Sequence, residues 1–135
     1  MNSYKGYKES DCYKKSRELR IFMSKLAKKF PPEEKYMLVS QSKRSSRSVT
    51  ATIAEGYGRY TYTDTRNFFI IARGSVTETM EHLATAFDEE YITEDELNKG
   101  DELCETCFKL INGFISYLDR SKTKGKSPEN PIPNS

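Results

Sequence analysis

The 135-residue chain contains no tryptophan, one histidine and three cysteines. An odd number of cysteines argues against a closed disulfide framework and favours a reducing compartment. No apolar run approaches the roughly 20 residues that a membrane-spanning helix needs, and the first residues lack the apolar segment of a signal peptide. The sequence therefore predicts a cytoplasmic protein with one folded domain and no membrane partner.

Motifs that carry catalysis or hold a cofactor are also missing. The G-Y-G run at residues 56–58 lacks the strand and the further glycine of a dinucleotide fingerprint, and no Walker-type loop occurs. Cys104 and Cys107 form a C-x-x-C pair within a predicted helix rather than at its start, so we interpret them as core thiols, with a metal or redox site as the weaker alternative. His82 has no nucleophile placed with it by a known motif. We predict no catalytic residue, no metal and no cofactor.

Apolar residues recur at helical spacing, which predicts four helices over about residues 10–30, 32–57, 63–91 and 94–120. Strand patterns are absent. Because the connections are short, consecutive helices should run antiparallel, which predicts an all-α, up-down-up-down four-helix bundle over residues 1–120. Residues 121–135 form a basic, proline-containing tail that we expect to be disordered.

Two local patterns mark the expected ends of helices. Thr93 and Glu96 have the spacing of a capping box, in which each side chain accepts a hydrogen bond from the other residue's backbone N–H. Gly56 and Gly58 follow a run of small residues at the end of the second helix. We expect positive φ angles at these glycines to end that helix.

The net charge of +2 conceals an uneven distribution of charged residues. Residues 1–66 hold 15 Lys and Arg against 7 Asp and Glu, whereas residues 67–120 hold 4 against 12. This division predicts a two-faced molecule, with one side suited to polyanions and the other to basic partners or to a second copy of the chain. The alternative is that the two halves neutralise each other within one fold.

The fourth helix has more apolar surface than a single core requires. Leu103, Leu110 and Tyr117 recur every seven residues beside its main apolar stripe, and Phe68 and Ile71 flank the stripe of the third helix. This surplus predicts packing between subunits. The alternative is that these residues are partly buried edges of one core.

Several motifs follow one another in a distinctive order: F-P-P-E-E-K-Y at residues 30–36, S-V at 48–49, I-A-E-G-Y-G-R at 53–59 and I-A-R-G-S at 71–75, with Glu81 further on. In these motifs the chain resembles the small four-helix-bundle proteins encoded by intervening sequences within bacterial 23S rRNA genes. That family is related in fold to the accessory variability determinant proteins of diversity-generating retroelements. The resemblance covers about residues 10–119. Cys12 and Tyr13 stand where the family usually has tryptophan, and Thr52 replaces its usual asparagine.

The resemblance implies a homopentameric ring with a basic channel and no catalytic activity. It also implies, as partners, nucleic acid and a reverse transcriptase, which the better-studied relatives bind.

The residues themselves also predict a nucleic-acid surface on the first two helices. Cations at helical spacing can contact phosphates without reading sequence, and a tyrosine beside an arginine can stack on a base. The predicted contact residues are Lys43, Arg44, Arg47, Lys14, Lys15, Arg17, Tyr57 and Arg59. One alternative is that these cations are only solvated and that the tyrosines pack the corner between helices. A second is that the chain binds no nucleic acid and docks a basic protein, such as a reverse transcriptase or a ribosomal protein.

Glu55 lies in a run of small apolar residues, where a carboxylate could suggest catalysis. We predict a structural role instead, as a partly buried ion pair or as a hydrogen-bond partner of the backbone near Gly56. Its expected partner is Arg66, or Arg73 of another subunit, because Arg73 of the same chain would lie about six residues, or ~9 Å, too far along the third helix.

Overall fold

The structure is a computed structural model that describes residues 6–123. The described chain consists of helices, two 3₁₀ turns and their connections, without a β-strand. In chain order these are α1 (Gly6–Glu9), α2 (Asp11–Leu26), η1 (Ala27–Lys29), η2 (Pro32–Glu34), α3 (Leu38–Tyr57), α4 (Tyr62–Asp88) and α5 (Glu94–Thr123). The prediction of an all-α fold is confirmed.

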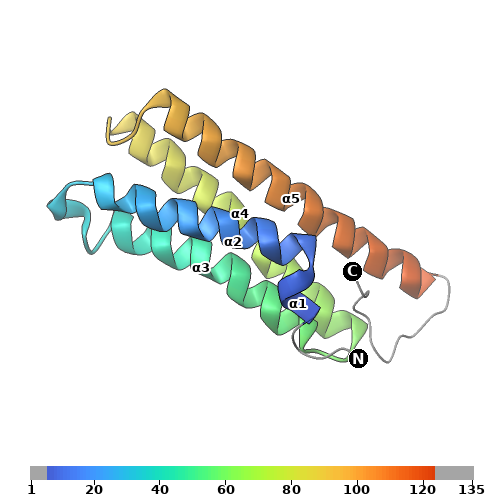
Figure 1. Ribbon diagram of the computed structural model, residues 1–135. Helices are drawn as coiled ribbons and strands as arrows, with labels where there is room; N and C mark the ends of the chain where they lie inside the picture. The colour runs from blue at the N-terminus through green and yellow to red at the C-terminus, as the bar shows by residue number, and fades with distance from the viewer. Residues whose placement is uncertain (1–5, 124–135) are drawn as a thin grey trace.

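The four long helices lie side by side in the cyclic order α2, α3, α4, α5 (Figure 1). Each of them packs against two neighbours, so α2 lies diagonally across from α4, and α3 from α5. As a result, the basic half of the sequence forms the α2–α3 side of the molecule and the acidic half forms the α4–α5 side. None of the described helices combines the length and the apolar character that crossing a membrane requires.

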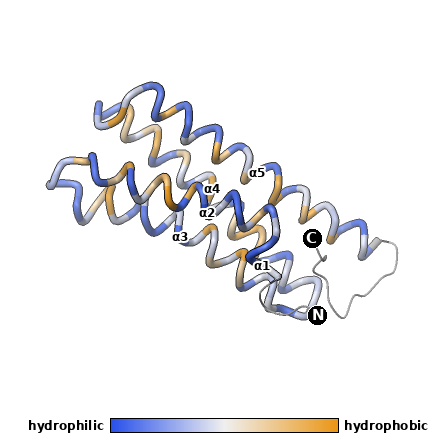
Figure 2. Tube along the Cα trace, viewed as in Figure 1, coloured by the Kyte–Doolittle hydropathy of each residue, from blue (hydrophilic) through white to orange (hydrophobic). Residues whose placement is uncertain are grey.

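The side chains between the four helices form one apolar core, and the hydrophobic positions recur along each helix (Figure 2). Burying one large aliphatic or aromatic side chain contributes roughly 1.5–3 kcal/mol. The largest fully buried side chains are Leu19, Met23, Val49, Ile53, Thr65, Phe69, Val76, Thr79, Leu83, Ile111 and Leu118. All four helices supply them, which explains why the helices pack as one unit.

Side chains cap the helices where the backbone N–H groups lack partners. The Thr93 N–H donates to Glu96 Oε1 (2.9 Å), and the Glu96 N–H donates to Thr93 Oγ1 (3.1 Å). The predicted capping box is therefore confirmed. At the other end of the connection, α4 closes with hydrogen bonds from the Glu90 N–H to Phe87 O and from the Tyr91 N–H to Ala86 O. Glu90 adopts a left-handed conformation there (φ 65°).

Several helix boundaries differ from the sequence prediction. The α2 helix ends at Leu26 and gives way to η1, instead of running to about residue 30, and α4 ends at Asp88 instead of near residue 91. The second long helix begins at Leu38 instead of near residue 32, because the chain first forms the η2 turn and then leaves helical geometry at Met37 (φ −120°, ψ −101°). The α5 helix continues to Thr123, three residues beyond the expected boundary of the bundle. The rest of the predicted tail, residues 124–135, and residues 1–5 lie outside the described residues.

The prediction that glycines end α3 through positive φ angles is wrong. Gly56 lies inside the helix, and Gly58 has a φ of −89°. A Cβ atom added to Gly56 would lie 2.8 Å from Cε1 of the buried Phe69 on α4. The absent side chain therefore lets α3 approach α4 closely, which is a packing role rather than a conformational one.

Candidate nucleic-acid interface

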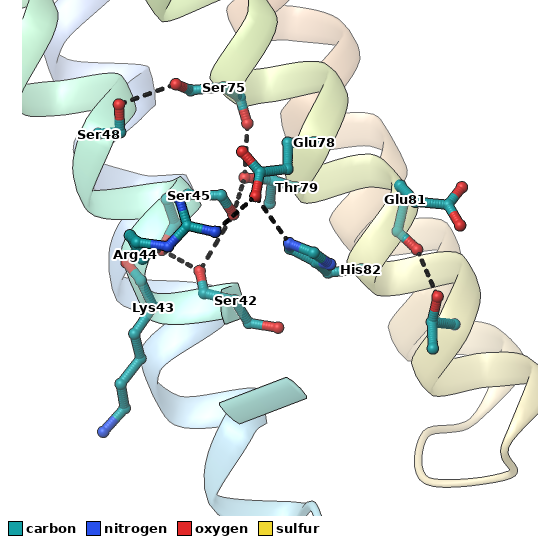
Figure 3. Close-up of polar contacts among 12 residues, drawn as sticks. Ser42, Lys43, Arg44, Ser45, Ser48, Ser75, Glu78, Thr79, Glu81 and His82 are labelled. Carbon is teal, nitrogen blue, oxygen red and sulfur yellow. Dashed lines mark hydrogen bonds and ion pairs between the residues drawn. The ribbon is translucent and has the colours of Figure 1, made fainter. Parts of the chain in front are cut away.

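The three predicted cations of α3 do not act as one group. Arg44 Nη2 donates to Glu78 Oε2 on α4 (3.1 Å), and the same oxygen lies 3.2 Å from His82 Nε2. Lys43 points away from this cluster (Figure 3). Arg47 is exposed, and within the described residues neither it nor Lys43 forms an ion pair. Arg44 thus helps to join α3 to α4, while Lys43 and Arg47 keep their charges available.

Hydroxyl groups continue the polar contact between α3 and α4. Ser45 Oγ lies 2.8 Å from Thr79 Oγ1, and Ser48 Oγ lies 2.8 Å from Ser75 Oγ (Figure 3). Small hydroxyl side chains allow two helices to approach and still satisfy their own polar atoms. We interpret this row, with the Arg44–Glu78 pair at its edge, as structural.

Arg20 is a cation that the sequence prediction missed. Its Nη1 donates to Thr50 Oγ1 (3.0 Å), which places it on the side of α2 that faces α3. Arg17 lies one turn earlier on the same side of α2. Lys14 and Lys15 lie more than about 100° around the helix from Arg20 at 100° per residue. The side chain of Lys15 pairs there with Glu18 (3.4 Å).

The contact between Arg20 and Thr50 also fixes the register of α2 against α3. In antiparallel helices this register puts residue 23 opposite Arg47 and residue 27 opposite Lys43. We use the name α2–α3 strip for the cations along this edge: Arg17, Arg20, Lys28, Lys43 and Arg47. The strip is roughly 16 Å long, taking 1.5 Å per residue from Arg17 to Lys28. The signal that could have revealed its α2 part is the spacing of Arg17 and Arg20, three residues apart on one face of α2, with Lys28 following in the η1 turn.

The α2–α3 strip contains no carboxylate. Between residues 17 and 28 and between 43 and 54 there is one acidic residue, Glu18, which pairs with Lys15 on the other side of α2. Arg17, Lys28 and Arg47 are exposed, whereas Arg20 and Lys43 are half-buried. Aligned cations without an acidic neighbour produce a positive potential that attracts phosphate groups.

Tyr57 is not available to stack on a base. Its ring centroid lies 5.9 Å from that of Phe69 and 5.9 Å from that of Phe114, and it lies nearly parallel to the Phe114 ring. The ring therefore packs the corner between helices, as the alternative interpretation had it. Arg59 is exposed, with its guanidinium 4.7 Å from the ring centroid of Phe68.

Comparison with known proteins agrees with this architecture. The family model of the 23S rRNA-intervening sequence proteins matches residues 8–113. The chain belongs to this family. A crystal structure from Bacteroides thetaiotaomicron, of a protein of unknown function from the S23 ribosomal protein family, is similar at 26% identity with a TM-score of 0.72, over 78% of this chain and 95% of that one. A search of curated proteins found no match.

The I-A-E-G-Y-G-R motif contains both buried and exposed residues: Ile53 and Gly56 are buried, whereas Glu55, Gly58 and Arg59 are exposed. The prediction of a partly buried Glu55 is wrong, because its side chain is exposed. Glu55 comes two residues after the buried Ile53, which turns it about 200° away from the core.

The two arginines that we expected near Glu55 bind elsewhere. Arg66 makes a two-pronged contact with Asp119 on α5 (2.8 and 3.3 Å), and Arg73 Nη1 donates to Asn112 Oδ1 (2.8 Å). The hydrogen bond from Arg66 lowers the pKa of Asp119. Both arginines thus join α4 to α5 in this family member.

The apolar stripe on α5 is half-buried against the core of its own chain. Leu103, Leu110 and Tyr117 all pack there, whereas Ile71 on α4 is 50% exposed. The three α5 residues therefore fit the alternative of core edges at the level of one chain. Self-association stays a prediction.

The three cysteines are buried thiols of the core. Burial raises the pKa of Cys12 to about 12 and that of Cys107 to about 11, and it also raises the pKa of Cys104. Ser16 Oγ lies 3.8 Å from Cys107 Sγ. Within the described part of the chain, no three His, Cys, Asp or Glu side chains come together in a way that could hold a metal ion. The arrangement supports the interpretation of Cys104 and Cys107 as packing residues.

Proposed function

We propose that the chain is a non-enzymatic, RNA-associated scaffold of the cytoplasm. In this proposal it is a four-helix bundle that self-associates as a ring and contacts RNA phosphates through the α2–α3 strip. The observation that carries the proposal is the set of five cations along the α2–α3 edge, where the one nearby carboxylate, Glu18, pairs with Lys15. The family description and the S23 ribosomal name of the structural relative favour RNA as the polyanion.

A strip of this kind holds the nucleic-acid backbone and does not read sequence. Lys and Arg groups contact phosphates, and each contact releases counterions, so the affinity should fall steeply as salt increases. Ring assembly repeats the strip around an axis and raises the affinity through multivalency.

The test replaces Arg17, Lys43 and Arg47 together with alanine. Binding of a labelled RNA is measured by fluorescence anisotropy over a range of salt concentrations. We expect the affinity to fall and the slope of log affinity against log salt to become shallower by roughly two to three, about one per lost phosphate contact.

A matched control replaces Lys14, Lys25 and Lys109 with alanine. These lysines are exposed, their removal changes the net charge equally, and none belongs to the α2–α3 strip. We expect this variant to bind RNA nearly as well as the wild type. Equal losses of RNA affinity in both triple variants would show that only the total charge matters. The assignment of the strip as the RNA-binding site would then be wrong.

One observation favours a second candidate function, the docking of a basic protein. The turn between α4 and α5 gathers five exposed acidic residues: Asp88, Glu89, Glu90, Glu94 and Asp95. A basic partner, such as a reverse transcriptase or a ribosomal protein, would meet this acidic turn. Replacing the five residues with Asn or Gln should then remove binding to that partner and leave RNA binding unchanged.

A further inference from the structure

We propose that the α2–α3 strip takes single-stranded nucleic acid and that Tyr36 stacks on an unpaired base at its end. This inference rests on the proposed function, because it specifies what the same strip binds. It starts from the most exposed large apolar side chains of the described residues, which include Tyr36 at 83% and Met37 at 61% exposure.

The position of Tyr36 follows from the topology. It lies in the connection between α2 and α3, just before Leu38 opens α3, and this connection closes one end of the α2–α3 edge. Lys28 and Lys43 lie at the same end of the strip. Lys43 lies five residues into α3 from Leu38, or roughly 7.5 Å at 1.5 Å per residue, and Tyr36 lies two residues before Leu38. A strand that follows the cations therefore reaches the ring as it leaves the strip.

The backbone around Tyr36 is held in place although its ring is exposed. Glu34 Oε1 accepts from the Leu38 N–H (3.2 Å), and Glu34 Oε2 accepts from the Tyr91 hydroxyl (2.7 Å). The Met37 N–H also donates to Glu34 O (3.0 Å). An aromatic ring on a fixed backbone loses little conformational freedom when a ligand binds.

The ring has the electrostatics of a stacking platform. Lys35 Nζ lies over one face of the ring, 5.3 Å from its centroid, and leaves the other face for a base. An 83% exposed ring still offers a face to a base. Base–aromatic stacking is indifferent to sequence, because every base has a π-face.

Stacking on Tyr36 requires an unpaired base. In a duplex the faces of the bases are covered by their neighbours, so a protein aromatic ring reaches them only in single strands, loops and ends. The strip, at roughly 16 Å, is long enough to contact a few successive phosphates of a single strand. Tyr36 would receive a base at the end of that contact.

Tyr60 provides a matched control. It is 80% exposed, but it lies in the connection between α3 and α4, which closes a different edge of the molecule. Tyr36→Ala and Tyr60→Ala thus remove the same exposed ring from two places. Tyr36→Phe keeps the ring and removes only the hydroxyl group.

The experiment compares the affinities of these variants for a single RNA strand and for a duplex of the same length. A length of about 12 nucleotides lies within the range of known single-strand site sizes. Tyr36→Ala should weaken binding of the single strand by about 5- to 100-fold. It should leave the duplex within about twofold, while Tyr36→Phe and Tyr60→Ala behave as the wild type. A DNA strand of the same sequence should show the same loss, because phosphates and base faces are common to both. The wild-type affinities for the RNA strand and the DNA strand then show which of the two nucleic acids the strip prefers.

A second readout uses the absence of tryptophan from the chain. The Tyr36→Trp variant carries a single tryptophan, whose fluorescence should be quenched by the single strand and not by the duplex. Normal single-strand affinity of Tyr36→Ala, equal losses on both probes, or an unquenched Trp would overturn the proposal. Failure of the proposed function would look different. In that case the triple alanine variant of Arg17, Lys43 and Arg47 would bind both probes as the wild type does, or the wild type would bind neither probe.

Discussion

Replacement of Gly56 by alanine tests the close approach of α3 and α4. The new Cβ atom would lie 2.8 Å from Phe69 Cε1, 3.0 Å from Phe69 Cδ1 and 3.2 Å from Phe68 Cβ. The Phe69 ring is fully buried and lies 4.3 Å, between centroids, from the Phe114 ring, so it has little room to move. The two helices must therefore separate or the ring must leave its preferred rotamer.

The magnitude follows from two opposing effects. Overpacking a filled core costs about 1–3 kcal/mol, whereas alanine in place of glycine inside a helix stabilises it by about 1 kcal/mol. We expect a net loss of up to about 2 kcal/mol in the free energy of unfolding, or a fall in Tm of up to roughly 8 °C. Urea unfolding followed by circular dichroism at a fixed protein concentration measures this difference.

Gly74 offers the matched control on α4. A Cβ atom added there would meet no atom within 4 Å apart from its own turn of helix, so Gly74→Ala keeps the gain in helix propensity and adds no clash. We expect it to stabilise the protein by up to about 1 kcal/mol. If both substitutions shifted the stability in the same direction, the steric argument for Gly56 would be refuted.

Three further predictions concern single groups. Glu90→Gly should stabilise the protein by about 0.5–1 kcal/mol in urea unfolding, because Glu90 holds a left-handed conformation that costs an L-residue energy. The pKa of Asp119 is lowered by Arg66, so its ionised form adds stability above its ordinary pKa of about 3.9 and loses that contribution as the pH falls through the lower folded value. Asp119→Asn should therefore be slightly less stable at neutral pH, by less than about 1 kcal/mol, and the difference should vanish in acid-unfolding measurements; an unchanged difference at low pH would contradict this. Because burial raises the pKa of Cys12 to about 12 and that of Cys107 to about 11, iodoacetamide at about pH 8 should alkylate the folded protein at least about 100-fold more slowly than the unfolded chain.

Local sequence patterns predicted the features that depend on nearby residues. The helices follow from apolar spacing, and the capping box of Thr93 and Glu96 follows from two residues three positions apart. Neither the prediction of the helices nor that of the capping box requires knowledge of the rest of the fold. The start of α3 was harder to predict, because Glu34 fixes it by accepting a hydrogen bond from Leu38 N–H and another from Tyr91, which is far away in the sequence.

The features that depend on helix pairing could not be predicted from the sequence. The role of Gly56 depends on Phe69 in the next helix. The predicted cation set was likewise chosen from the spacing within one helix. Pairing then directs Arg44 to Glu78 and adds Arg20 through its contact with Thr50.

The charge division of the sequence now has a spatial meaning that limits how copies can assemble. Because α2 and α3 adjoin each other, as do α4 and α5, the basic edge and the acidic turn belong to different sides of one molecule. Copies joined basic side to acidic side would cover the α2–α3 strip with carboxylates, and a covered strip could not reach phosphate groups. RNA contact and this mode of assembly therefore exclude each other. If the proposed function holds, the copies must meet through another surface. Ile71 on α4, which is 50% exposed, and the half-buried stripe of Leu103, Leu110 and Tyr117 on α5 offer apolar area outside the strip.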